Sequence, residues 1–115
     1  MRIKKARQIL KSLADDTRLR IINILKKGGL TVTEICAVLE KEQSNISKHL
    51  ARLRLTEVVR DKRKGNNVYY FLEKPSNTAH KELINSITKG LADLETFKSD
   101  IKNMEKRKKV LAEKK

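Results

Sequence analysis

The stretch from residue 43 to residue 72 reads QSNISKHLARLRLTEVVRDKRKGNNVYYFL, and its hydrophobic period changes halfway along. In the first half, Ile46, Leu50 and Leu53 recur at three- and four-residue spacing, which predicts one apolar helical face. In the second half, β-branched and aromatic residues flank residues 62–67, where Gly and Asn indicate a turn. The stretch therefore predicts a helix followed by a β-hairpin.

The helix predicted over residues 43–55 is polar and basic on the side opposite its apolar stripe. The DNA major groove, about 12 Å wide, accepts one α-helix, and Gln and Asn are the side chains that pair bidentately with adenine. A solvated polar face has a similar composition, so this helix alone does not establish DNA binding. If it does bind DNA, the contacts are expected from Gln43, Ser44, Asn45, Ser47, Lys48, His49 and Arg52.

The predicted hairpin supplies positive charge, because three consecutive cations fall in its connecting segment. Long cationic side chains on a hairpin suit the phosphate backbone, and phosphate contacts carry no direct sequence information. We expect the hairpin to contact DNA through Lys62, Arg63, Lys64, Asn66 and Asn67.

Three further helices are predicted before residue 43. The first covers residues 2–14, and the second begins after a capping segment at residues 15–17 and stops at Gly28-Gly29. The third is short, with Thr33 as its expected cap. Four helices followed by a basic hairpin is the element order of a winged helix-turn-helix, in which one helix enters the groove and the preceding helix braces it.

Residues 76–115 are predicted to form one long helix. Its apolar residues follow a seam with an average spacing of 3.5 residues, which is typical of two helices that pack along their length. The same seam would also form if the helix packed on its own core. The seam residues are Ile87, Leu94, Phe97, Ile101, Met104 and Leu111.

The charge of the chain indicates a polyanionic partner. Lys and Arg number 28 and Asp and Glu number 14, which gives a net charge of +14. The 115 residues are enough for one domain.

The single cysteine, Cys36, excludes an intrachain disulfide framework and a cysteine-rich zinc site. With no apolar run long enough to span a membrane and no secretory signal pattern, we expect a cytoplasmic, nucleoid-associated protein without a membrane partner.

LADDTRLRI at residues 13–21, QSNISKHL at residues 43–50 and GNNVYYFL at residues 65–72 occur in this order along the chain. Together these three motifs resemble the arsenic-repressor (ArsR) family of winged-helix transcriptional regulators. LADDTRLRI at residues 13–21 is similar to the family's L-A-D-P-T-R-L-x-I, with Asp16 in place of the usual Pro. QSNISKHL at residues 43–50 is similar to its recognition helix, and GNNVYYFL at residues 65–72 to its wing, without the Arg that the wing tip often has. The resemblance covers about residues 8–73.

The resemblance implies a single domain over residues 1–115, mainly α with a small β-hairpin. Residues 8–73 would form the winged-helix core, and residues 76–115 a dimerisation helix with a basic tail. It also implies a homodimer joined through the first and last helices, which represses transcription at a near-palindromic operator in double-stranded DNA. The interface residues are then expected to be Ile3, Leu10, Leu83, Ile87, Leu94, Phe97 and Ile101.

Metal sensing is the best-known activity of the family, but the family's ligands do not recur here. Where one family site has a Cys-Val-Cys pair, this chain has Thr31 and Thr33, and hydroxyls do not replace thiolates for a soft metal. A second family site needs several ligands on the last helix, where His80 is followed by no His over residues 86–97. We therefore expect no metal site and no cofactor, and nothing in the sequence indicates a particular small-molecule effector.

Two alternatives to a repressor remain at the level of sequence. An abundant architectural DNA-binding protein of low sequence specificity would suit the high charge and the basic segment at residues 98–115. A metal or thiol sensor would have to use Cys36 across a dimer. An enzyme is not expected, because no nucleophile and base pair and no Gly-rich phosphate loop occurs.

Overall fold

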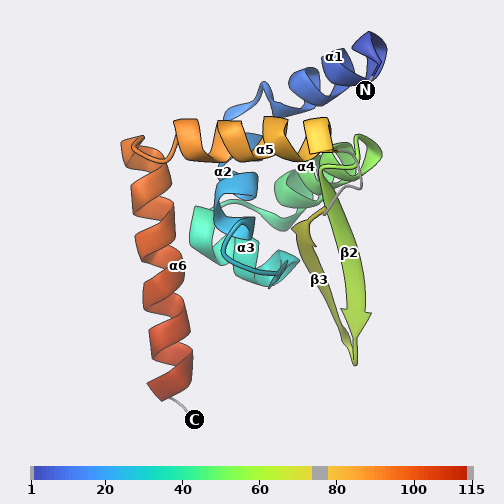
Figure 1. Ribbon diagram of the computed structural model, residues 1–115. Helices are drawn as coiled ribbons and strands as arrows, with labels where there is room; N and C mark the ends of the chain where they lie inside the picture. The colour runs from blue at the N-terminus through green and yellow to red at the C-terminus, as the bar shows by residue number, and fades with distance from the viewer. Residues whose placement is uncertain (1, 74–77, 114–115) are drawn as a thin grey trace.

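The computed structural model describes residues 2–73 and 78–113, with side chains to residue 108 (Figure 1). The described elements confirm the predicted fold class, because helices dominate and a small antiparallel sheet carries the hairpin. In chain order they are α1 (Ile3–Leu13), α2 (Asp16–Leu25), β1 (Leu30–Thr31), α3 (Val32–Leu39), α4 (Gln43–Leu55), β2 (Val59–Lys64), β3 (Asn67–Leu72), α5 (Thr78–Gly90) and α6 (Glu95–Glu113).

Side-chain caps fix where two helices begin. The Asp15 carboxylate accepts a 3.0 Å hydrogen bond from the backbone amide of Arg18 and so starts α2. α3 begins with a capping box, in which the Thr31 hydroxyl and the Glu34 carboxylate each accept a hydrogen bond from the other residue's backbone amide. The predicted cap, Thr33, was therefore wrong, because only Thr31 has a Glu three residues further on.

The sheet has three strands in the order β1-β3-β2, one more than the predicted hairpin. The short strand β1 pairs Leu30 with Tyr70 and thereby ties the start of α3 to the hairpin. β2 and β3 pair from Val59 opposite Leu72 to Lys64 opposite Asn67, so the basic run lies within β2. The expectation that the three cations lie in the segment connecting the strands was therefore wrong, since β2 continues through them to the turn at residues 65–66.

The core is built mainly from α2, α3 and α4. Ile21, Ile22 and Ile24 of α2 are fully buried, and the predicted stripe of α4 packs against them with Ile46, Leu50 and Leu53 at most 1% exposed. Buried apolar surface contributes about 25 cal/mol per Å². The face of α4 that carries these three residues is therefore fixed against the body, and the opposite face points outward.

The predicted single C-terminal helix is two helices. α5 ends at Gly90, residues 91–94 form a turn, and α6 begins at Glu95 and runs in a different direction along α2 and α3 (Figure 1). The backbone amide of Leu94 donates to the carbonyl of Leu91 at 3.0 Å, which closes this turn. The start of the predicted helix at residue 76, together with residues 74–77, lies outside the described residues.

The turn at residues 91–94 divides the predicted apolar seam between α5 and α6, which run in different directions. In α6, Phe97 and Met104 are each 3% exposed because the body of their own chain covers them. The 3.5-residue spacing was consistent with packing against a second copy or against the chain's own core. For Phe97 and Met104 the chain's own core is the partner. The last seam residue, Leu111, lies beyond the described side chains.

Candidate nucleic-acid interface

The outward face of α4 carries the predicted base-reading residues together. Six of the seven residues predicted on this helix are exposed, and they lie at its start and along its solvent side. The helix is held by its buried stripe rather than by a capping side chain, since its N-cap residue Glu42 makes no side-chain hydrogen bond. The exposed residues of this face are Gln43, Ser44, Asn45, Ser47, Lys48 and Arg52.

His49, the seventh predicted residue on α4, lies on a different side of the helix. Its ring is half-buried against α2, with Nδ1 at 3.1 Å from Nη1 of Arg18 and 3.8 Å from Oδ1 of Asp15. A guanidinium only donates hydrogen bonds, so Nδ1 accepts this one when the ring is neutral. In the structure His49 therefore joins α4 to α2, and its predicted contact with DNA stays a prediction.

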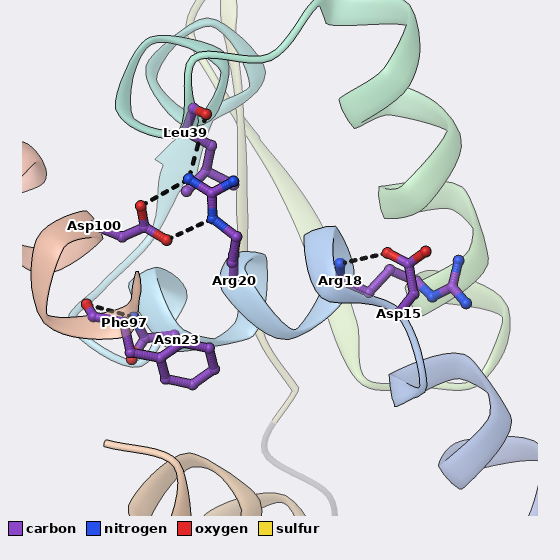
Figure 2. A network of polar contacts seen from close by, with 7 residues as sticks. All are labelled: Asp15, Arg18, Arg20, Asn23, Leu39, Phe97 and Asp100. Carbon is purple, nitrogen blue, oxygen red and sulfur yellow. Dashed lines mark hydrogen bonds and ion pairs between the residues drawn. The ribbon is translucent and has the colours of Figure 1, made fainter. Parts of the chain in front are cut away.

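The Asp15 carboxylate also lies at this junction between α2 and α4, and Figure 2 shows the hydrogen bond that it accepts from the Arg18 amide. Burial by itself would raise the pKa of Asp15, but the hydrogen bond from the Arg18 amide and the nearby positive charges of His49 and Arg18 lower it overall. The Arg18 guanidinium also donates from Nε to the carbonyl of Ser12, at the end of α1. One arginine thus links three helices at the base of α4.

Strand alternation places the three wing cations on two different faces. Lys62 and Lys64 lie on one face of the sheet, where they line a shallow hollow with Tyr69 and Phe71. Arg63 lies on the other face, the same one as Asp61. Because Asp61 pairs with Arg54 of α4 at 3.3 Å, the Arg63 face is the one turned toward the recognition helix.

The predicted interface residues fall into three groups. The residues of the first group are large apolar side chains exposed to solvent, namely Ile3, Leu10 and Leu94, which are 83%, 50% and 48% exposed. The second packs partly against the core and comprises Leu83, Ile87 and Ile101. The third is Phe97, whose own chain already covers it, which corrects the expectation that it faces a second copy.

The residues considered as metal ligands lie apart. Thr31 is engaged as the cap of α3, and Cys36 lies half-buried in α3 against the core, where burial raises the pKa of its thiol. His80 is 3% exposed on α5, and burial lowers its pKa, as does the nearby ammonium of Lys5. Among the described side chains, those of residues 2–73 and 78–108, no group of three or more His, Cys, Asp or Glu is placed to hold a metal ion.

Several residues of the junctions were missed by the sequence reasoning. Arg18 and Arg20 lie within the family-like motif, but their partners His49 and Asp100 are 31 and 80 positions away. Asn23 likewise donates from Nδ2 to the carbonyl of Phe97 at 3.1 Å. Nothing local in the sequence marks such pairs, because each partner is chosen only when the helices pack.

The fold and this surface together define a class of protein, the winged helix-turn-helix proteins. A polar recognition helix fixed by a buried stripe, a brace helix before it and a basic wing beside it form the arrangement that docks on duplex DNA. None of the helices in the described parts of the chain is long and apolar enough to cross a membrane.

Sequence comparison identifies the family within this class. The pattern of the bacterial regulatory protein arsR family matches residues 15–61, from the cap of α2 to the middle of β2. The transcriptional repressor PagR of Bacillus anthracis is 34% identical over 88 residues, which are 76% of this chain and 88% of PagR. The chain therefore belongs to the arsR family, and the resemblance noted in its motifs is confirmed.

Two further comparisons define how far the similarity extends. The arsenic resistance transcriptional regulator ArsR1 of Pseudomonas putida is 40% identical over 89 residues, 74% of this chain and 64% of ArsR1. The chain thus spans slightly less than two thirds of that relative. The structure of reduced HlyU from Vibrio cholerae superimposes with a TM-score of 0.66 at 32% identity, covering 80% of this chain and 90% of HlyU.

Proposed function

We propose that this protein is a sequence-specific DNA-binding transcriptional regulator, a repressor that binds a near-palindromic operator as a homodimer. The observation that carries the proposal is the exposed polar face of α4, held rigidly by Ile46, Leu50 and Leu53. Family membership supports it, since the relatives carry regulator names and PagR is named as a repressor. The proposed location is the cytoplasm, at the nucleoid.

The proposed roles of the two DNA-facing elements differ. α4 reads bases through Gln43 and Asn45 at its start, because short amide side chains there can pair with base edges. β2 contacts phosphates, with Arg63 on the side of the recognition helix. Further contacts are proposed from Ser44, Ser47, Lys48 and Arg52 on the helix and from Asn66 and Asn67 at the turn of the wing. Lys62 and Lys64, which lie on the opposite face of the sheet from Arg63, are proposed to contribute less.

The homodimer is proposed to form through α1 and the C-terminal segment of α5 and α6, where Leu83, Ile87, Leu94 and Ile101 are the remaining expected interface residues. Ile3 and Leu10 lie seven residues apart on the same face of α1, and both are exposed in the single chain. Covering such side chains with a second copy removes apolar surface from water. A two-fold dimer presents two recognition helices, which matches a palindromic operator.

The proposal is tested by selecting duplexes from a random-sequence library with the wild-type chain and mapping its sites in genomic DNA. A regulator should select one near-palindromic sequence and occupy a small number of sharp genomic sites. Binding to the selected duplex should exceed binding to random DNA by about 10³-fold or more at physiological salt. Selection of no common sequence would reject the proposal.

The second candidate is an architectural DNA-binding protein, and the net charge of +14 favours it. A chain with this charge binds any duplex through counterion release. It would cover genomic DNA broadly and show no preferred sequence. The same genomic mapping therefore decides between the two candidates.

A further inference from the structure

Arg20 lies where the recognition helix is joined to the rest of the molecule. It projects from α2 toward the last turn of α3, and its Nη2 lies 3.4 Å from the carbonyl oxygen of Leu39, the last residue of α3. The next residue, Glu40, ends α3 in a left-handed conformation at φ 55° and ψ 49°. Three residues after Glu40, α4 begins at Gln43. The turn between the two helices is thus built directly on the residue that Arg20 contacts.

A cation suits this position. The last carbonyl groups of a helix have no partners within the helix, and they carry the negative end of its dipole. The guanidinium of Arg20 supplies both a hydrogen-bond donor and a positive charge to the end of α3. Its own position therefore influences the path of the chain into the turn at residues 40–42.

Asp100 of α6 holds this guanidinium from the other side. Nε of Arg20 donates to Oδ2 of Asp100 at 2.8 Å, and Nη2 donates to Oδ1 at 2.9 Å (Figure 2). This two-pronged geometry fixes the plane of the guanidinium as well as its place. Asp100 is 2% exposed, so water does not compete for its oxygens, and its carboxylate raises the pKa of Arg20.

We propose that Asp100 is a positioning residue for DNA recognition, which acts through Arg20 on the end of α3 and so sets the angle of the recognition helix. α6 then works as a brace on the helix-turn-helix of its own chain. The inference rests on the proposed function, because its consequence is measured as operator recognition. It concerns a residue outside the segment that matches the family pattern.

The chain offers a matched control in Asn23. Its Nδ2 also joins α2 to α6, by a 3.1 Å hydrogen bond to the carbonyl of Phe97. Figure 2 shows this bond beside the Arg20 and Asp100 pair, but it does not reach α3. Loss of the Asn23 side chain weakens the docking of α6 and leaves the path from Asp100 to Leu39 intact.

The test compares Asp100→Ala, the milder Asp100→Asn and Asn23→Ala with the wild-type chain. Affinities are measured for the duplex that the wild type selects from a random library and for a random-sequence duplex, at a temperature where each variant is fully folded. Amide hydrogen exchange of residues 40–43 is followed without DNA. Asp100→Ala should lose about five- to tenfold in selected-site affinity, within the range of single-residue effects on coupling, and little on random DNA. Its turn amides should exchange faster.

The remaining outcomes separate the possibilities. Asp100→Asn should lie between the wild type and Asp100→Ala, while Asn23→Ala should lower the unfolding temperature and leave both the affinity ratio and the turn exchange at wild-type values. Equal effects of Asp100→Ala and Asn23→Ala on the affinity ratio and turn exchange would overturn the proposal, as would unchanged turn exchange in Asp100→Ala. If the wild type selects no sequence, the proposed function fails, and the exchange measurement still decides whether Asp100 positions the turn.

Discussion

Truncation of Arg63 provides a quantitative test of how the wing contacts DNA. Arg63 is exposed on β2, on the face that carries the Asp61 to Arg54 pair and therefore faces the recognition helix. If it neutralises one phosphate, a dimer loses two such contacts in Arg63→Ala. Each contact contributes about 0.9 to the slope of log affinity against log salt, so the slope should become shallower by about 1.8.

This slope change predicts that the DNA affinities of the wild type and Arg63→Ala become more similar as the salt concentration rises. When the salt concentration is raised about fourfold, the wild-type advantage over Arg63→Ala should shrink by about twelvefold. Affinities are to be measured by fluorescence anisotropy over a salt series, with the selected duplex and with a random duplex. The loss should be similar on both duplexes, because phosphates carry no direct sequence information.

Lys62→Ala is the matched control, since Lys62 is also an exposed cation and lies one position away on the opposite face of the same strand. It should change the slope by less than half as much as Arg63→Ala. Equal slope changes in the two variants would refute the assignment of the Arg63 face to DNA. A change of preferred sequence in Arg63→Ala would show instead that this side chain reads the DNA bases or groove shape.

Four other predictions follow from the described residues. Asn45→Ala should cost about 1–3 kcal/mol per lost base pairing on the selected duplex and almost nothing on random DNA, as measured by competition binding. Leu10→Asp should turn the dimer into a monomer in sedimentation at micromolar concentration, whereas Leu55→Asp, also at an exposed apolar position but on α4, should leave it dimeric. Burial lowers the pKa of His80 in the folded chain, so the unfolded chain binds a proton at His80 at a higher pH than the folded chain does. The free energy of unfolding should therefore fall as the pH drops below about 6.5, and His80→Gln should reduce that fall in chemical denaturation. Zn(II), Cd(II) or As(III) at stoichiometric levels should change the affinity for the selected duplex by less than about threefold, a coupling below about 1 kcal/mol, and a tenfold loss would point to Cys36 as a ligand.

The local sequence was sufficient to predict the helices that carry the candidate site. The stripe of Ile46, Leu50 and Leu53 predicts a helix over residues 43–55, and α4 has those bounds. The acidic segment at residues 15–17 contains the cap of α2. These features are decided by contacts between residues three or four positions apart, so periodicity and capping chemistry reveal them without knowledge of the rest of the fold.

Tertiary packing decided what these elements contact. An apolar seam with 3.5-residue spacing has the same appearance whether a second copy or the chain's own core covers it, and in α6 the core covers Phe97 and Met104. The pairing of Arg20 with Asp100 joins residues 80 positions apart. Whether they meet depends on the turn after Gly90, which sends α6 in a different direction from α5 (Figure 1). Sequence spacing determines which face of a helix is apolar, but the contacts of that face depend on where distant segments pack.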